Sequence, residues 1–290
     1  MTAGVVWALV SALGFGLTQI LNRKSNMIVG APRTAFGLLL AVEVLLLGRL
    51  AITGEYRLIA GAPPAALGAF VASGVIHYAV GWTLLAFSQE QIGVGPTGAI
   101  VSFTPLVAAM LAVPILDEAL TVWSLGGVVL AVVGVTLVSL SRSKARAASV
   151  FPGFALAVAL CWGSSPIFIR IGLQGLDAPV AGLTVGLGVA LLLHALILTA
   201  LGQWSEGSWS AAAVGWMVIG GVTGAVGIGA QWISYGLTTV AIASTIQQLA
   251  VLVVVGFAPL VFGSAERVNA MLVVGTAMLL SGAVLIVWIG

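Results

Sequence analysis

The sequence predicts an all-α integral membrane protein whose ten transmembrane helices form two inverted five-helix repeats. Three observations predict this fold: the composition, the lengths of the apolar runs, and an internal repeat. Hydrophobic residues make up 61% of the 290 residues and charged residues only 6%, whereas soluble domains carry about 25% charged residues. No water-soluble surface can be built from such a composition, and the formal net charge of +2 is too small to indicate a nucleic-acid partner.

Ten apolar runs follow one another along the chain, separated by charged and turn-forming residues. Each is close to the length of about 20 residues that a helix needs to cross a bilayer. The runs are far longer than the strands of a membrane β-barrel and lack their alternating pattern. The first run has no basic flank or small-residue cleavage site, so we expect a retained helix rather than a signal peptide. The expected spans are residues 4–22, 33–53, 65–87, 93–115, 121–140, 152–171, 179–201, 211–235, 240–262 and 268–289.

The second half of the sequence repeats the first half. At an offset of 148 residues, Thr97 corresponds to Thr245 and Glu118 to Glu266. Five helices per copy is an odd number, so the two copies must insert with opposite orientations, as in many secondary transporters. We expect a first repeat at residues 1–140, a basic connector at 141–151 and a second repeat at 152–290.

Several glycines recur in the two copies as well. Close helix packing alone accounts for recurring glycines, but it accounts poorly for an acidic residue that recurs at one loop position. The matched pairs are Gly127 with Gly275 and Gly134 with Gly282 at the offset of 148, and Gly4 with Gly153 and Gly14 with Gly163 at an offset of 149.

Two kinds of motif occur once in each half: a small-residue turn in the first helix and an acidic step after the fourth. The turns are Leu13-Gly14-Phe15-Gly16 and Cys161-Trp162-Gly163-Ser164-Ser165, and the acidic steps are Asp117-Glu118 and Ala265-Glu266. Their order and spacing resemble the drug/metabolite transporter superfamily, EamA type, over essentially the whole chain. Within it, the sequence is most similar to the YddG-type exporters of aromatic amino acids. The resemblance implies a secondary transporter that exports small hydrophobic or aromatic metabolites by alternating access.

Basic residues are divided unequally between the two sides of the expected topology. Seven lie in loops opposite the N-terminus and three on the N-terminal side. The positive-inside rule then places the connector, residues 141–149, in the cytoplasm and both termini outside. We expect a multi-pass protein of the inner (plasma) membrane.

Polar and aromatic side chains within the runs recur at helical spacing. Tyr78 and Trp82 are four residues apart and share one helix face. Buried amides need hydrogen-bond partners, and lipid offers none, so these faces should point inward and line a cavity between the repeats. Singly, each polar group is explained as well by an interhelical contact worth about 0.6 kcal/mol. The substrate-binding candidates are Tyr78, Trp82, Trp162, Ser165, Gln19, Gln231, Tyr235, Ser244 and Gln248.

The sister helix supports a special role for the stretch around Tyr78. At the 148 offset, His77, Tyr78 and Trp82 correspond to Ala225, Val226 and Ala230. The fold alone therefore does not require these three side chains. For an aromatic amino acid, Tyr78, Trp82 and Trp162 could stack on the ring or hold the ammonium group. The lack of a mid-membrane Lys or Arg argues against a phosphorylated substrate.

Two ionisable residues are candidates for proton coupling, and two prolines for gating. Glu43 lies near the middle of the second run, where an acidic residue costs about 2.5–3.5 kcal/mol on insertion scales. His77 is the other coupling candidate, and each has a packed, hydrogen-bonded alternative. Pro105 and Pro166 interrupt expected helices and are candidate hinges; in the second copy, Val253 stands where Pro105 maps.

Other functions remain open at this point. An exporter of other amino acids, drugs or cations fits the same pattern, and a passive channel fits less well. An intramembrane enzyme is disfavoured because the spans contain no His-Glu-x-x-His, Gly-x-Gly-Asp or paired Asp motif. We expect no enzymatic activity, no metal and no cofactor. The expected partners are a small-molecule substrate and the lipid bilayer, and a monomer would suffice.

Overall fold

The structure, a computed structural model, describes residues 2–92, 94–141, 152–200, 202–204, 209–262 and 269–288. In these residues the first half contains α1 (Thr2–Val29), α2 (Ala31–Thr53), α3 (Tyr56–Ala60), α4 (Pro64–Gly74), the π-helix η1 (Val75–Gly81), α5 (Trp82–Ile92), α6 (Val94–Val101), α7 (Thr104–Leu116) and α8 (Val122–Ser141). The second half contains α9 (Gly153–Gly175), α10 (Pro179–Ala200), α11 (Ala211–Leu237), α12 (Val240–Gln247), α13 (Ala250–Phe262) and α14 (Ala270–Trp288). The described chain contains no strand.

Ten helical segments of the described chain are long and apolar enough to cross a membrane. The third span joins α4, η1 and α5, the fourth joins α6 and α7, and the ninth joins α12 and α13. Each half contributes five spans, so the halves cross the bilayer in opposite directions. The predicted fold class is confirmed.

The first helix is longer than predicted. The expected end at residue 22 is wrong, because α1 continues to Val29 through Arg23 and Lys24, which were expected in a loop. No proline or glycine interrupts this stretch, and the helix ends only at Gly30, whose φ of +83° favours glycine. Arg23 and Lys24 stay at the same end of the molecule, where both cations lie over the Phe262 ring.

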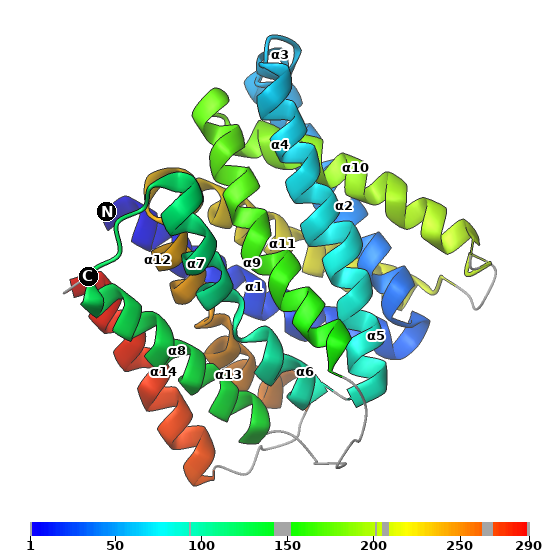
Figure 1. Ribbon diagram of the computed structural model, residues 1–290. Coiled ribbons are helices and arrows are strands. Elements are labelled where there is room, and N and C mark those ends of the chain that lie inside the picture. The colour runs from blue at the N-terminus through cyan, green and yellow to red at the C-terminus, as the bar shows by residue number, and fades with distance from the viewer. Residues whose placement is uncertain are drawn as a thin grey trace.

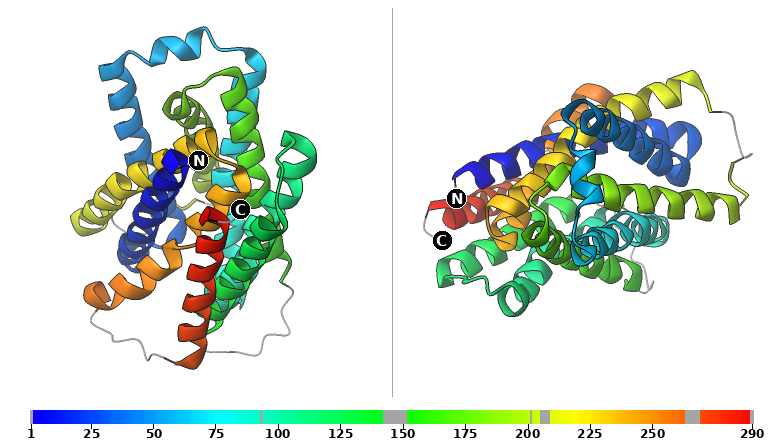
Figure 2. Two further views of the ribbon diagram at one scale, coloured as in Figure 1. Left: turned by 90° about the vertical axis from the view of Figure 1, so that its left-hand side faces the viewer. Right: turned by 90° about the horizontal axis from the view of Figure 1, so that it is seen from above.

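The helices pair in a pattern that a pseudo-two-fold axis relates. In Figure 1, α8 and α14 run side by side, and α2 packs on α10. The first span, α1, packs on α11, and correspondingly α9 packs on α4, η1 and α5. Likewise α1 contacts α13, as α9 contacts α7. Figure 2 shows that the described parts near both chain ends lie at one end of the bundle.

The four glycines that recur at the offset of 148 meet each other between α8 and α14. An added Cβ on Gly127 would lie 2.8 Å from the Gly282 carbonyl oxygen, and one on Gly282 would lie 2.6 Å from that of Gly127. The same reciprocal contact joins Gly134 and Gly275, at 2.7 and 2.8 Å. Small residues thus let the α8 and α14 backbones touch, which is how helices associate tightly in lipid.

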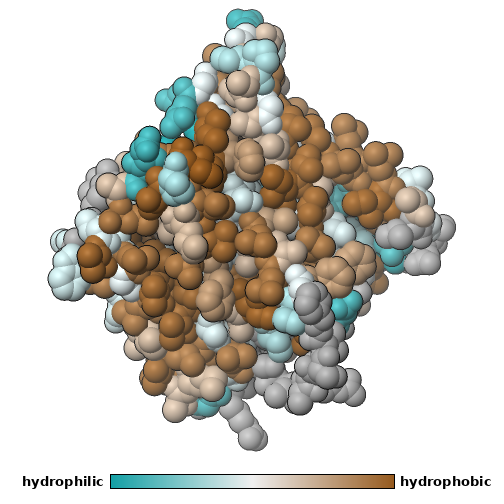
Figure 3. Space-filling view, in the orientation of Figure 1, coloured by the Kyte–Doolittle hydropathy of each residue, from teal (hydrophilic) through white to brown (hydrophobic). Residues whose placement is uncertain are grey.

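The outer surface matches a hydrocarbon environment. Figure 3 shows a surface that is largely hydrophobic, with polar residues near the end that carries α3 and at the margins. Exposed Leu, Val, Ile and Met side chains occur on every spanning segment. The exposed ion pair Arg49–Glu55, 2.8 Å long, lies at the end of α2, where water is near.

The fourth span of each repeat is broken near its middle. α6 gives way to α7 at Ser102 and Phe103, directly before Thr104 and Pro105. The expected interruption at Pro105 is therefore observed, and Pro105 lies in the first turn of α7, where a helix needs no backbone N–H donor. In the second copy α12 and α13 separate at Gln248, where there is no proline.

The expected break at Pro166 is not observed. Helix α9 is continuous from Gly153 to Gly175 with Pro166 inside it. Proline removes one backbone N–H donor, which would leave the carbonyl of Trp162 without its helical partner. The Ser165 hydroxyl donates to that Trp162 carbonyl at 3.5 Å, which offsets part of the loss.

Candidate functional site

A π-helical turn in the third span organises the candidate site. η1 covers Val75–Gly81 and carries His77 and Tyr78, both buried. π-helices are rare, occur mostly as single wide turns inside α-helices, and are frequent at functional sites. Glycines flank the turn: Gly74 abuts the backbone of Gly186, and a Cβ on Gly81 would lie 2.5 Å from the Trp162 indole nitrogen. The sequence stretch that stood out for its polar aromatics is thus also irregular in its backbone.

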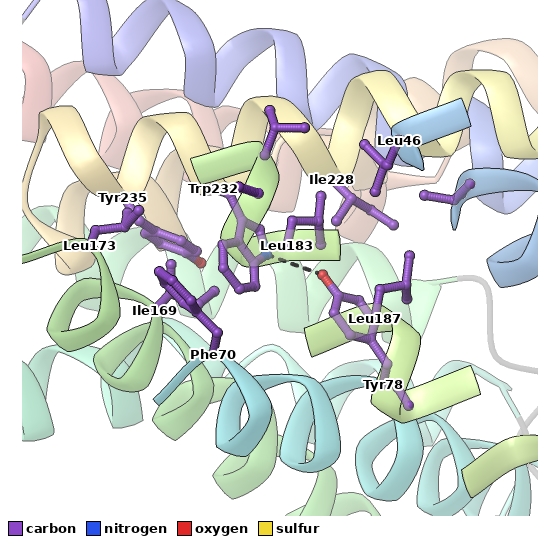
Figure 4. Close-up of a cluster of buried hydrophobic side chains, with 14 of the residues drawn as sticks. Leu46, Phe70, Tyr78, Ile169, Leu173, Leu183, Leu187, Ile228, Trp232 and Tyr235 are labelled. Atoms are coloured by element: carbon purple, nitrogen blue, oxygen red, sulfur yellow. Dashed lines mark hydrogen bonds between the residues drawn. The ribbon is translucent and has the colours of Figure 1, made fainter. Parts of the chain in front are cut away.

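Tyr78 lies at the centre of an aromatic cluster that joins the two halves. Its hydroxyl accepts a hydrogen bond from Trp232 Nε1 on α11, 3.3 Å away (Figure 4). The Trp232 ring also lies 5.6 Å from that of Phe70, and the Tyr78 ring lies 6.2 Å from that of Trp82. Trp232 is 0% exposed and Tyr78 1%. These side chains fill the space between the repeats at this level.

His77 lies beside Tyr78, with ring centroids 4.6 Å apart, and is held by α9. Its Nδ1 lies 2.7 Å from Ser165 Oγ, and its ring stacks on Trp162 with centroids 5.4 Å apart and planes 14° apart. The Trp162 indole N–H donates to the His77 backbone carbonyl at 3.1 Å. Ser165 and Trp162 are three residues apart on α9, so one helix face supplies both contacts.

A second polar cluster lies on α11 and α12. Gln231 Nε2 donates to the Tyr235 hydroxyl at 3.2 Å and to Gln247 Oε1 at 2.6 Å. The Tyr235 hydroxyl also lies 3.3 Å from Ser244 Oγ. Gln231 precedes Trp232 in the chain, so adjacent residues of α11 serve the two clusters. The predicted residues Gln231, Tyr235 and Ser244 therefore come together.

Among the residues that the structure describes, three polar atoms near these clusters are buried and have no hydrogen-bond partner: His77 Nε2, Trp82 Nε1 and Gln231 Oε1. Buried polar groups are nearly always satisfied, and an unsatisfied group costs about 1–3 kcal/mol. The indole N–H is a donor and the amide oxygen an acceptor. A ligand with both an acceptor and a donor could satisfy them, and no charged side chain takes part in the hydrogen bonds of either cluster.

Two predicted binding residues lie apart from these clusters. Gln19 is exposed on α1, whereas its neighbour Thr18 is buried and bonds to Thr223 Oγ1 at 2.8 Å and to the Gly14 carbonyl. Gln248 is half-buried at the break between α12 and α13, and its side-chain amide has no hydrogen bond with the described residues.

The binding candidates chosen from the sequence do not include Trp232, Gln247 or Phe70. Trp232 lies close to the end of α11 at Leu237, so its position alone does not separate it from a residue of the interfacial belt. Its place beside Gln231 is the signal that could have found it.

Glu43 occupies a different place in the bundle. Its carboxyl group is buried and has no hydrogen-bond or ion-pair partner among the described residues, and it faces α10 near Gly188, where an added Cβ would lie 3.3 Å from Oε1. None of its contacts joins it to His77. The two coupling candidates are therefore not hydrogen-bonded to each other.

Glu118 ties helices together at the end of the bundle that carries the termini. Its Oε1 accepts a hydrogen bond of 2.7 Å from the backbone N–H of Val240, at the start of α12. Burial raises the pKa of Glu118, whereas the backbone N–H groups of Val240 and Ala241 and the Arg170 guanidinium act to lower it. Arg170 in turn donates to the Tyr235 carbonyl. This set of contacts links α7, α9, α11 and α12 just beyond Tyr235.

Other features of the described chain carry no chemistry of this kind. Its His, Cys, Asp and Glu side chains form no group of three or more that could hold a metal ion. A shallow groove of about 450 Å³ runs over the outer face of α8 and α14 between Val122, Val129 and Met278. Its lining is apolar and faces the hydrocarbon region, so it belongs to the lipid surface.

Ten spans in two repeated halves, with buried aromatic and polar clusters where the halves meet, define a membrane transporter of the inverted-repeat class. The chain belongs to the EamA-like transporter family, whose sequence model matches residues 2–140 and again residues 152–288.

Among solved structures, one titled "Crystal structure of protein" has the same fold. It aligns with a TM-score of 0.79 and 13% identity, over 99% of this chain and 98% of that chain. No curated protein matches the sequence.

Proposed function

We propose that this EamA-family transporter is a secondary carrier that exports small hydrophobic or aromatic metabolites, with aromatic amino acids as its substrates. The observation that carries the proposal is the set of unpartnered buried atoms, His77 Nε2, Trp82 Nε1 and Gln231 Oε1, beside aromatic rings. An amino acid presents a carboxylate, an ammonium group and a side chain. The indole N–H suits the carboxylate, the amide oxygen suits the ammonium, and the rings suit an aromatic side chain.

The uncharged character of the two clusters supports a zwitterionic or neutral substrate. A phosphorylated substrate would want a Lys or Arg that binds the phosphate. Arg170 is the basic residue nearest the clusters by its contacts, and its guanidinium is already engaged by the Tyr235 carbonyl and by Glu118. Charge therefore favours amino acids over sugar phosphates.

Transport would proceed by alternating access. The halves at residues 1–140 and 152–290 would rock about the pseudo-two-fold axis, with the connector 141–151 on the cytoplasmic side of the inner membrane. Because Tyr78, Trp232 and Tyr235 fill the space between the halves, substrate entry requires these rings to separate. The breaks at Ser102 and Gln248 supply bending points in both halves. One copy of the chain contains all of these parts.

An uptake assay in proteoliposomes tests the proposal. A panel of amino acids is offered at two pH values, with and without a membrane potential. We expect saturable uptake of L-phenylalanine, L-tyrosine and L-tryptophan, and weak uptake of L-alanine and L-glutamate. Saturable uptake of drugs or cations with no amino-acid uptake would reassign the substrate class. Uptake that never saturates would instead indicate a channel.

A further inference from the structure

The carbonyl groups in the last turn of η1 accept hydrogen bonds from the other half of the protein. Trp162 Nε1 on α9 donates to the His77 carbonyl at 3.1 Å, and His194 Nε2 on α10 lies 2.9 Å from the Tyr78 carbonyl. A carbonyl only accepts, so His194 Nε2 must carry the proton. Two consecutive backbone oxygens of the first half are thus held by side chains of the second half.

These side-chain donors contact the carbonyl groups at the end of the π-helix, where a backbone donor is missing. Backbone hydrogen bonds span five residues in a π-helix and four in an α-helix. The step back to the shorter spacing leaves one carbonyl without a backbone donor. Tyr78 lies in the last turn of η1, which ends at Gly81. Since a buried unpaired carbonyl is costly, the His194 donor stabilises this exit from the π-helix.

The other half of the molecule provides an internal comparison. The sister helix, α11, is α-helical throughout Ala211–Leu237. At the offset of 149, Trp162 corresponds to Leu13. At any offset from 147 to 149, His194 corresponds to one of the leucines 45–47. Where both donors are missing, the wide turn is missing as well.

The π-helix sets which way the side chains of the next helix face. Converting η1 to α-helix would rotate the residues after it by about 100° relative to those before it. Trp82 is the first residue of α5, and its ring now lies 6.2 Å from that of Tyr78. Tyr78 and Trp82 are four residues apart and share one face in either kind of helix. The rotation would therefore turn the Trp82 ring relative to α4, which precedes η1 and carries Phe70.

We propose that His194 is a positioning residue that, together with Trp162, holds the third span in its π-helical register and so sets the direction in which Trp82 faces relative to α4. The register itself is independent of what the protein carries. The consequence for substrate affinity rests on the proposed function.

Hydrogen–deuterium exchange and transport together test this proposal. His194→Leu removes the donor as the first half does naturally, His194→Gln keeps an N–H donor, and Trp162→Phe keeps a ring on His77 but removes the indole N–H. We expect amide exchange in residues 75–82 to speed up about fivefold in His194→Leu and in Trp162→Phe, as the loss of one hydrogen bond predicts. His194→Gln should exchange like the unmodified protein.

In proteoliposomes, His194→Leu should raise the KM for L-phenylalanine with little change in maximal rate, and His194→Gln should restore it. Unchanged exchange in both His194→Leu and Trp162→Phe would overturn the proposal, as would faster exchange in His194→Gln. If the unmodified protein carries no amino acid, the proposed function fails, and the exchange rates alone decide about the register.

Discussion

At the scale of single residues, the side chains around Tyr78 divide into two groups. Trp162, Ser165 and Trp232 have their hydrogen-bonding groups engaged within the protein. Trp82 and Gln231 each keep one polar atom without a partner. The first group holds the site in shape, and the second group is available to a substrate.

Trp82 should therefore favour large aromatic substrates over small ones. Trp82→Ala removes an aromatic surface and should raise the KM for L-tryptophan about tenfold, the effect of losing roughly 1.4 kcal/mol of ring contact. L-alanine uptake should change little. Trp82→Phe is the matched control, because it keeps an aromatic ring and loses the indole N–H. Its KM for L-tryptophan should lie between those of the unmodified protein and Trp82→Ala. Equal losses for large and small amino acids in Trp82→Ala would assign Trp82 to the fold instead.

Glu43 should not couple protons to transport. It contacts α10 near Gly188 and has no hydrogen bond to either cluster. Glu43→Gln keeps the shape of the side chain and removes the ionisable group. We expect Glu43→Gln to transport L-phenylalanine as the unmodified protein does, with the same response to an imposed pH gradient. Loss of that response in Glu43→Gln would make Glu43 the coupling residue.

The site could be predicted from the sequence only as far as helix periodicity reaches. The contrast of His77, Tyr78 and Trp82 with three small or aliphatic residues of the sister helix pointed to the stretch that forms η1. Spacing alone could not decide between Thr18 and Gln19, because neighbouring residues differ by about 100° in direction. Only the packing of α1 on α11 decides that Thr18 is the buried one.

At the scale of elements, the irregular helices are the features that are hardest to predict from the sequence. The π-helix η1 lies in an apolar run that reads as ordinary helix, because side chains on α9 and α10, far away in sequence, stabilise it. Pro105 predicts the break between α6 and α7 from the sequence. The break at Gln248 has no proline. Its turns are closed by hydrogen bonds that span three residues instead of four, such as the one from the Leu249 N–H to the Ile246 carbonyl.

Glu118 controls an element contact that should depend on pH. Burial raises its pKa in the folded protein, so the folded state holds the proton more tightly than a solvated carboxyl does. The net contribution of the Glu118 side chain to stability is therefore full below the ordinary value of 4.5 and is lost as pH rises through the raised pKa. Arg170 limits the effect, because it favours the ionised form.

Glu118→Gln tests this dependence. The amide oxygen still accepts from the Val240 N–H but no longer ionises. We expect the unmodified protein in detergent to lose more thermal stability than Glu118→Gln when pH rises from about 4 to about 8. Parallel stability curves for the two proteins would show that Glu118 does not titrate in this way.

At the scale of the whole molecule, reciprocal glycine contacts hold α8 against α14. A Cβ on Gly127 would meet Ile286 Cγ1 at 2.5 Å, whereas a Cβ on the adjacent Gly126 would meet only Leu285, at 3.8 Å. Gly127→Ala should therefore destabilise the protein by about 1–3 kcal/mol through overpacking. Gly126→Ala should be neutral or slightly stabilising, because alanine favours helix. Thermal unfolding in detergent compares the two, and equal stabilities would contradict the contact.

The architecture could be predicted almost completely from the sequence, for physical reasons. Lipid forces every backbone group into a helix and demands apolar runs of fixed length. The repeat then fixes how the helices pair, and the four glycines matched at the offset of 148 meet between α8 and α14. Helix ends were less certain, as the seven further residues of α1 up to Val29 show, because charged residues tolerate the interface as well as a loop.

Counterflow in proteoliposomes tests the central claim most directly. Vesicles are loaded with unlabelled L-phenylalanine and diluted into labelled L-phenylalanine, without a pH gradient or membrane potential. A carrier that alternates access should accumulate label transiently above equilibrium, and Trp82→Ala should need more L-phenylalanine to reach half of this effect. Simple equilibration of label without overshoot, in a protein shown to be folded, would contradict an aromatic amino-acid carrier.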